Sequence, residues 1–126
     1  MSDPVYEHGM QVRREVLGDA HVDRAIERTT DFTAEFQNLI TRLAWGEIWS
    51  RPGLDRKTRS AITLTAMVAL GRDEELAMHV RAALRNGLTS DEIKEVLLHA
   101  TVYCGVPAGN AAFAIAQRVL EEAASE

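Results

Sequence analysis

Residues 73–100 have the sequence DEELAMHVRAALRNGLTSDEIKEVLLHA, in which the pair Asn86-Gly87 separates two runs of regularly spaced apolar residues. In each run the apolar side chains recur every three or four residues, which places them on one face of an α-helix. The first face carries Leu76, Val80, Ala83 and Leu84, and the second carries Ile93, Val96, Leu97 and Ala100. The second run begins with a capping box, Thr89-x-x-Glu92. The stretch therefore predicts two antiparallel helices joined by a short turn.

Helical spacing continues on both sides of this stretch, and no segment alternates with the period of two that is typical of a strand. We expect further helices over residues 6–17, 19–29, 36–46, 55–70 and 107–120, with Asp19 and Asp55 as N-caps. The third of these has one apolar face, formed by Phe36, Leu39, Ile40, Leu43 and Ala44. In the fourth we expect burial of Ile62, Met67, Val68 and Leu70. The pattern predicts an all-α fold of about seven helices, in a single domain over residues 1–126.

The composition limits the class of protein. The chain has 126 residues, of which 46% are hydrophobic and 26% charged, as in ordinary globular domains. It has no apolar run long enough to cross a membrane, and its first residues lack the pattern of a secretory signal. A single cysteine, Cys104, excludes an intrachain disulfide and favours a cytoplasmic location. A net charge of −5 with scattered arginines argues against a nucleic-acid partner, whereas a small anion could bind where a few arginines converge.

The last helix predicts self-association. Its segment Ala111-Ala112-Phe113-Ala114-Ile115-Ala116 is apolar on nearly every side, and such a helix has to be covered on every side. Because aromatic residues make up only 6% of this short chain, one copy can hardly supply that cover. We therefore expect a homo-oligomer.

Residues 40–60, ITRLAWGEIWSRPGLDRKTRS, hold the strongest indication of function. Both tryptophans of the chain, Trp45 and Trp49, flank Glu47 there, and five cations accompany them: Arg42, Arg51, Arg56, Lys57 and Arg59. Aromatic side chains, a carboxylate and clustered guanidinium groups favour a site for a small anion. The alternative is a buried tryptophan pair that anchors a bend, with solvated charges around it.

Three of these cations lie in the expected first turn of a helix, within Asp55-Arg56-Lys57-Thr58-Arg59. Cations at a helix N-terminus oppose the helix dipole, at a cost of about 0.3–1 kcal/mol each. A bound anion would offset that cost, since the free N–H groups of a helix N-terminus also attract anions. Alternatively Asp55, Glu47 or a neighbouring subunit neutralises the cations.

Among the histidines, His79 shares the inward face of its helix, either as a core imidazole or as a group that transfers protons near neutral pH. His99 and Tyr103 lie one turn apart near an apolar face, where such residues often border a core. His8 and His21 have polar neighbours and are expected at the surface. No His, Cys, Asp or Glu grouping has the spacing of metal ligands, so the sequence implies no metal.

Three segments together resemble a known family: GxxVRREVLGDAHVDRA, AWGEIWSRPGLDRKTRS and MHVRAALRNGLTSDEIKEVLLHATVYCGVPAGNAAF. They are similar to the 4-carboxymuconolactone decarboxylases of bacterial protocatechuate breakdown, over residues 10–123. The wider superfamily shares an all-α fold with alkylhydroperoxidase D, whose redox branch carries a CxxCxxxH motif. Aligned through His79, the two cysteine positions of that motif fall on Arg72 and Glu75, and a Glu typical of that branch falls on Ser60. Disulfide exchange requires a thiolate pair, so we expect no peroxidase activity.

The resemblance implies a cofactor-free decarboxylation of an anionic lactone by a ring-shaped homo-oligomer, a hexamer of dimers or trimers. It makes His79 the first candidate for general acid or oxyanion donor, and Glu47 the second candidate or the residue that orients His79. Candidate carboxylate ligands are Arg42, Arg51 and Arg59; Trp45 and Trp49 would wall the cavity, and Tyr103 is a further substrate-binding candidate. Two alternatives remain, an enzyme for a different lactone or β-dicarbonyl substrate and a non-catalytic oligomeric binding protein.

Overall fold

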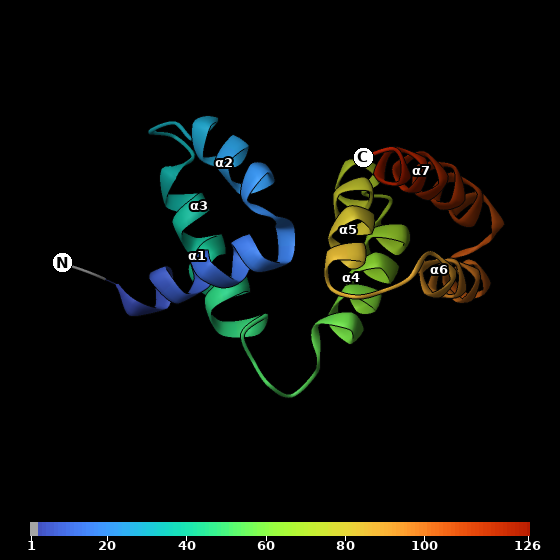
Figure 1. Ribbon diagram of the computed structural model, residues 1–126, viewed down its shortest axis with the longest axis horizontal. Coiled ribbons are helices and arrows are strands. Elements are labelled where there is room, and N and C mark those ends of the chain that lie inside the picture. Colours follow the sequence, from blue (N-terminus) through green and yellow to red (C-terminus); the bar gives the residue numbers. More distant parts are fainter. Residues whose placement is uncertain (1–2) are drawn as a thin grey trace. The chain divides into compact units, whose positions relative to one another are not determined.

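The structure, a computed structural model, describes residues 3–126, and all regular structure in that range is helical (Figure 1). In chain order the elements are α1 (Pro4–Leu17), α2 (Asp19–Glu27), α3 (Ala34–Ile40), the π-helix η1 (Thr41–Ile48), α4 (Arg56–Leu70), α5 (Asp73–Arg85), α6 (Ser90–Cys104) and α7 (Val106–Ala124). The prediction of an all-α fold is therefore confirmed. In the described range, no helix is both long and apolar enough to cross a membrane.

The helices form two compact units. The first comprises the residues up to Asp55 and contains α1, α2, α3 and η1; the second runs from Arg56 to Glu126 and contains α4 to α7. Single-domain organisation over the whole chain stays a prediction.

The second unit has an apolar core to which all four of its helices contribute. The helical faces predicted for α5 and α6 supply fully buried side chains, among them Leu76, Val80, Ile93 and Leu97. The predicted capping box at the start of α6 is present: Glu92 N donates to Thr89 Oγ1 and Thr89 N donates to Glu92 Oε1, each at 3.0 Å. The hydrogen bond from the backbone N–H of Thr89 to the carboxylate, together with the hydrogen bond and charge of Lys57, holds the pKa of Glu92 below its usual value.

Several expectations about helix ends and apolar faces are wrong. Asp19 is not an N-cap, because Gly18 occupies that position and Asp19 pairs with Arg14 at 3.1 Å. The predicted apolar face of the third helix is largely exposed, at Phe36, Leu39 and Leu43. In α4 Ile62 and Leu70 are exposed as well, whereas Val68 is buried as predicted. Within each unit, therefore, some apolar side chains have no cover.

Candidate functional site

The segment that carries most of the candidate residues is a π-helix. In η1 the backbone N–H of Trp49 donates to the carbonyl oxygen of Ala44 at 2.8 Å, five residues back rather than four. The sequence predicted that this helix ends near Trp45-Gly46, and helical structure continues slightly further, to Ile48. π-Helices are rare and occur frequently at functional sites. The position of η1 therefore agrees with a site in this segment.

A close approach of two backbones holds η1 against α1. A Cβ on Gly9 of α1 would overlap the carbonyl oxygen of Thr41 and lie 2.9 Å from the backbone nitrogen of Gly46. A Cβ on Gly46 would in turn lie 2.7 Å from the carbonyl oxygen of Val5. Only glycine allows the two helices to approach this closely without displacement. The two glycines therefore hold η1 in position against α1, together with the side chains that η1 carries.

Side-chain hydroxyls at both ends of η1 satisfy backbone carbonyl groups. Thr41 Oγ1 donates to the carbonyl oxygen of Gln37 at 2.8 Å, and Ser50 Oγ donates to that of Gly46 at 2.6 Å. Carbonyl groups near the ends of a helix need partners outside the helical pattern. The hydroxyl of Ser50 provides such a partner where η1 ends, and the hydroxyl of Thr41 is a second donor to a carbonyl group that also accepts from the backbone N–H of Thr41.

The two tryptophans lie in contact, with ring centroids 5.3 Å apart and ring planes tilted by 32°. Trp45 is only 6% exposed and packs inside the first unit, whereas Trp49 is partly exposed. Trp45 is buried, as the alternative of a packed tryptophan pair expected, whereas Trp49 is not, so the roles of both residues stay predictions. Trp49 is the member of the pair with surface left for a ligand.

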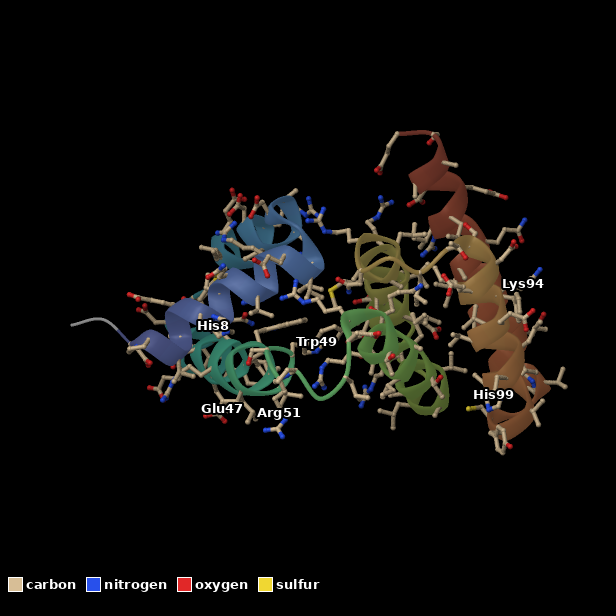
Figure 2. All side chains as sticks on the ribbon, turned by 60° about the horizontal axis from the view of Figure 1, so that its bottom comes forward. His8, Glu47, Trp49, Arg51, Lys94 and His99 are labelled. Atoms are coloured by element: carbon tan, nitrogen blue, oxygen red, sulfur yellow. The ribbon has the colours of Figure 1, made fainter. Side chains whose placement is uncertain are left out.

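Glu47 lies near the C-terminal end of η1 and Arg51 follows just after this helix, and both are exposed. Figure 2 shows their side chains projecting from the same side of the first unit. Arg42, at the other end of η1, forms an ion pair with Asp3 at 3.1 Å. Arg42 therefore has a carboxylate partner within its own unit.

The other three candidates belong to the second unit. Arg59 on α4 and His79 on α5 are both half-buried. Tyr103 is 78% exposed near the end of α6, so the expectation that it borders a core is wrong for this unit. Its ring contacts that of His99, with centroids 5.1 Å apart, and Figure 2 shows His99 on the surface of α6.

The structure adds one charged group that the sequence did not indicate. Arg13 of α1 is buried, although its position between Val12 and Arg14 gives no sign of it. The charge of Arg13 also contributes to a lower pKa of His21, a residue that was expected at the surface but is partly buried. Burial and the charges of Arg24, Arg13 and Arg28 lower the pKa of His21.

Neither a metal site nor a thiol pair is found in the described part of the chain. No group of three or more His, Cys, Asp or Glu side chains in residues 3–126 is arranged to hold a metal ion. Cys104, at the end of α6, is a half-buried free thiol.

Known proteins are similar to this chain over most of its length. The carboxymuconolactone decarboxylase family matches residues 34–118. A 4-carboxymuconolactone decarboxylase of Acinetobacter baylyi is 53% identical over 117 residues, which are 93% of this chain and 87% of that protein. The nitrosuccinic acid decarboxylase npaB of Metarhizium robertsii is 43% identical over 118 residues, 94% of this chain and 82% of that protein. A 4-carboxymuconolactone decarboxylase of Pseudomonas putida is 64% identical over 42 residues, 33% of this chain and 88% of that protein.

Proposed function

This chain belongs to the carboxymuconolactone decarboxylase family, and from that premise we propose that it is a carboxy-lyase that converts 4-carboxymuconolactone to 4-oxoadipate enol-lactone. The observation that carries the proposal is the 53% identity to the decarboxylase of Acinetobacter baylyi over 87% of that protein. The reaction would be a step of protocatechuate breakdown in the cytoplasm. The lone Cys104 supports that location.

The chemistry of this substrate explains how a protein can decarboxylate it with side chains alone. The departing carboxylate is on the ring carbon bonded to the lactone oxygen. As CO₂ leaves, the electron pair moves through the ring C=C into the lactone carbonyl and gives a 2-oxyfuran dienolate. The substrate is its own electron sink, a task that other decarboxylations assign to a cofactor. The protein has to hold the carboxylates, stabilise the developing oxyanion and protonate carbon.

The candidate residues can be matched to these three tasks. Arg51 offers an exposed guanidinium just after η1, and Arg59 offers a half-buried one on α4. His79 is half-buried, a setting in which a hydrogen bond to a developing oxyanion is worth more than in water. Glu47 shares its side of the first unit with Arg51 and is the second candidate for proton transfer. Trp49 would exclude water from the reacting ring.

A second candidate function is the decarboxylation of a different small acid. The 43% identity to a nitrosuccinic acid decarboxylase over 94% of this chain favours it. A nitro group, like a lactone carbonyl, accepts the electron pair that departing CO₂ leaves behind. Both reactions therefore require the same oxyanion stabilisation, and they differ in the shape of the acid.

An activity assay distinguishes these functions. Purified protein is mixed with 4-carboxymuconolactone, which is generated by the upstream cycloisomerase. The loss of lactone absorbance is then followed. Nitrosuccinic acid is tested in parallel by CO₂ release. We expect kcat/KM to be much higher for the lactone. The reverse order would favour the second function, and no turnover of either acid would favour a non-catalytic binding protein.

We expect Arg51→Ala to raise KM for the lactone by about tenfold or more, with a smaller fall in kcat. The guanidinium would hold a carboxylate that is present in the ground state as well as in the transition state, and loss of such a contact mainly weakens binding. Initial rates over a range of lactone concentrations measure both constants. Arg85→Ala, which removes an exposed arginine at the end of α5, is the matched control and should leave KM unchanged.

We further propose that the protein is a homo-oligomer. The family resemblance implies that this oligomer is a hexamer. Large apolar side chains at the end of α6 and the start of α7 support it, because Val102 and Val106 are 77% and 72% exposed. Static light scattering at micromolar concentration should give several times the chain mass of 13.9 kDa. A monomer mass under these conditions would contradict the proposal.

A further inference from the structure

Arg13 lies inside the first unit with only neutral partners. The residue is 7% exposed, and its Nη1 and Nη2 donate to Thr41 Oγ1 and Gln37 Oε1, each at 3.2 Å. Its Nε is buried and has no hydrogen-bond partner. The adjacent Arg14, in contrast, pairs with Asp19 at 3.1 Å and with Asp23 at 2.9 Å.

This environment leaves a buried positive charge without compensation. In residues 3–126 no carboxylate forms an ion pair with Arg13. A guanidinium does not give up its proton in a protein, and a buried charge is costly without a counter-charge. Burial lowers the pKa of Arg13, and the charge of Arg14 adds to that effect while Tyr6 opposes it. The local potential is therefore positive and favours an anion.

A cavity of about 370 Å³ adjoins the Arg13 side chain. All of its lining residues belong to α1, to α2 and the turn that follows it, to α3 and to the start of η1. Gln37, Asn38 and Thr41 are among its polar lining residues, and Met10 and Ile26 among its apolar ones. The volume is within the range of small-molecule sites, and a charged group in a partly apolar wall is typical of them.

We propose that this cavity is a binding site for a small organic carboxylate, with Arg13 holding the carboxylate and Met10 and Ile26 contacting the apolar body. The half-buried side chain of Gln37 would turn away and leave Nη2 to the ligand, while Thr41 keeps its bond to Nη1. One guanidinium matches the single charge and the planar shape of a carboxylate. Phosphate, with its higher charge and no apolar part, fits this lining less well. The inference is independent of the decarboxylase activity, since it uses neither Glu47 nor Arg51.

Sodium benzoate is a suitable probe, with benzamide as its neutral analogue and inorganic phosphate as a different anion. Each is titrated into the ¹⁵N-labelled full-length protein, and backbone amide shifts are recorded. We expect saturable shifts with benzoate at residues 10–14 and 37–41, and none there with benzamide. Equal responses to benzoate and benzamide, or shifts confined to other regions, would overturn the proposal. Equal affinity for phosphate would overturn its restriction to carboxylates.

Arg13→Met should weaken benzoate binding by about thirtyfold or more, the effect typical of removing one partner of a buried charged pair. Arg28→Met removes the same charge from an exposed position of the first unit and is the matched control, with unchanged affinity expected. Benzoate binding by folded Arg13→Met at wild-type affinity, or equal loss in the control, would contradict the site. If Arg13→Met does not fold, Arg13→Lys replaces it and should also bind more weakly, because lysine lacks the planar fork.

Discussion

His79→Ala should lower kcat for 4-carboxymuconolactone by about 10²–10⁴ while KM changes little. Under the proposed function, the imidazole donates a proton or a hydrogen bond to the dienolate that forms as CO₂ leaves. That interaction strengthens as negative charge moves onto the lactone oxygen, so its loss affects the transition state more than substrate binding. Initial-rate kinetics at saturating and limiting lactone concentrations separate the two constants.

Two controls are needed for this variant. His79 is half-buried on α5, so its truncation can also leave a cavity in the second unit, and circular dichroism and thermal unfolding have to show that the variant is folded. His8→Ala removes an exposed imidazole of α1 and should keep wild-type kinetics (Figure 2). If folded His79→Ala retained near-normal kcat, Glu47 would become the leading candidate for proton transfer.

The second large effect is expected on stability. Gly9→Ala should lower the free energy of unfolding by about 1–3 kcal/mol, the usual cost of forcing extra atoms into a packed contact. In an ordinary helix the same change stabilises, by up to about 1 kcal/mol. At Gly9 the sign is reversed, because the new methyl group would meet the carbonyl oxygen of Thr41 and the backbone of Gly46. Urea unfolding followed by circular dichroism measures the difference.

Gly53→Ala is the matched control for this prediction. A Cβ at Gly53 would have nothing within 4 Å, and its backbone is not in the region of positive φ. We expect this variant to unfold like the wild type, or to be slightly more stable because alanine restricts the unfolded chain. Equal stability of both alanine variants would mean that α1 and η1 can move apart at little cost.

The second unit illustrates what apolar spacing can predict. The capping box of Thr89 and Glu92 and the turn at Asn86-Gly87 are local chemistry, and the inward residues of α5 and α6 follow from periodicity. These expectations are confirmed. Periodicity identifies an apolar face, but it does not show whether the same unit covers that face. This is why the exposure of Phe36 and Ile62 was not predicted.

The candidate site was predicted less completely, for two physical reasons. The stretch around Glu47 was identified from its residue types, but a shift from four-residue to five-residue hydrogen bonding leaves no periodic mark in eight residues. Arg13 was missed because a buried cation is indistinguishable from a surface cation in one sequence. Its burial depends on Gln37 and Thr41, which lie 24 and 28 residues away along the chain.

The π-helix also has a consequence for how chain length varies among relatives. A five-residue hydrogen bond such as that from Trp49 to Ala44 encloses one residue more than an α-helical turn. Deleting a single residue here would let the segment return to α-helical bonding, and the residues after it would keep their direction, because the widened turn and an α-helical turn each complete about one revolution. Only the side chains within the widened turn, Glu47 among them, would change their direction. A one-residue gap in an alignment at η1 would therefore indicate a local change in the side chains offered to a ligand, with the rest of the fold preserved.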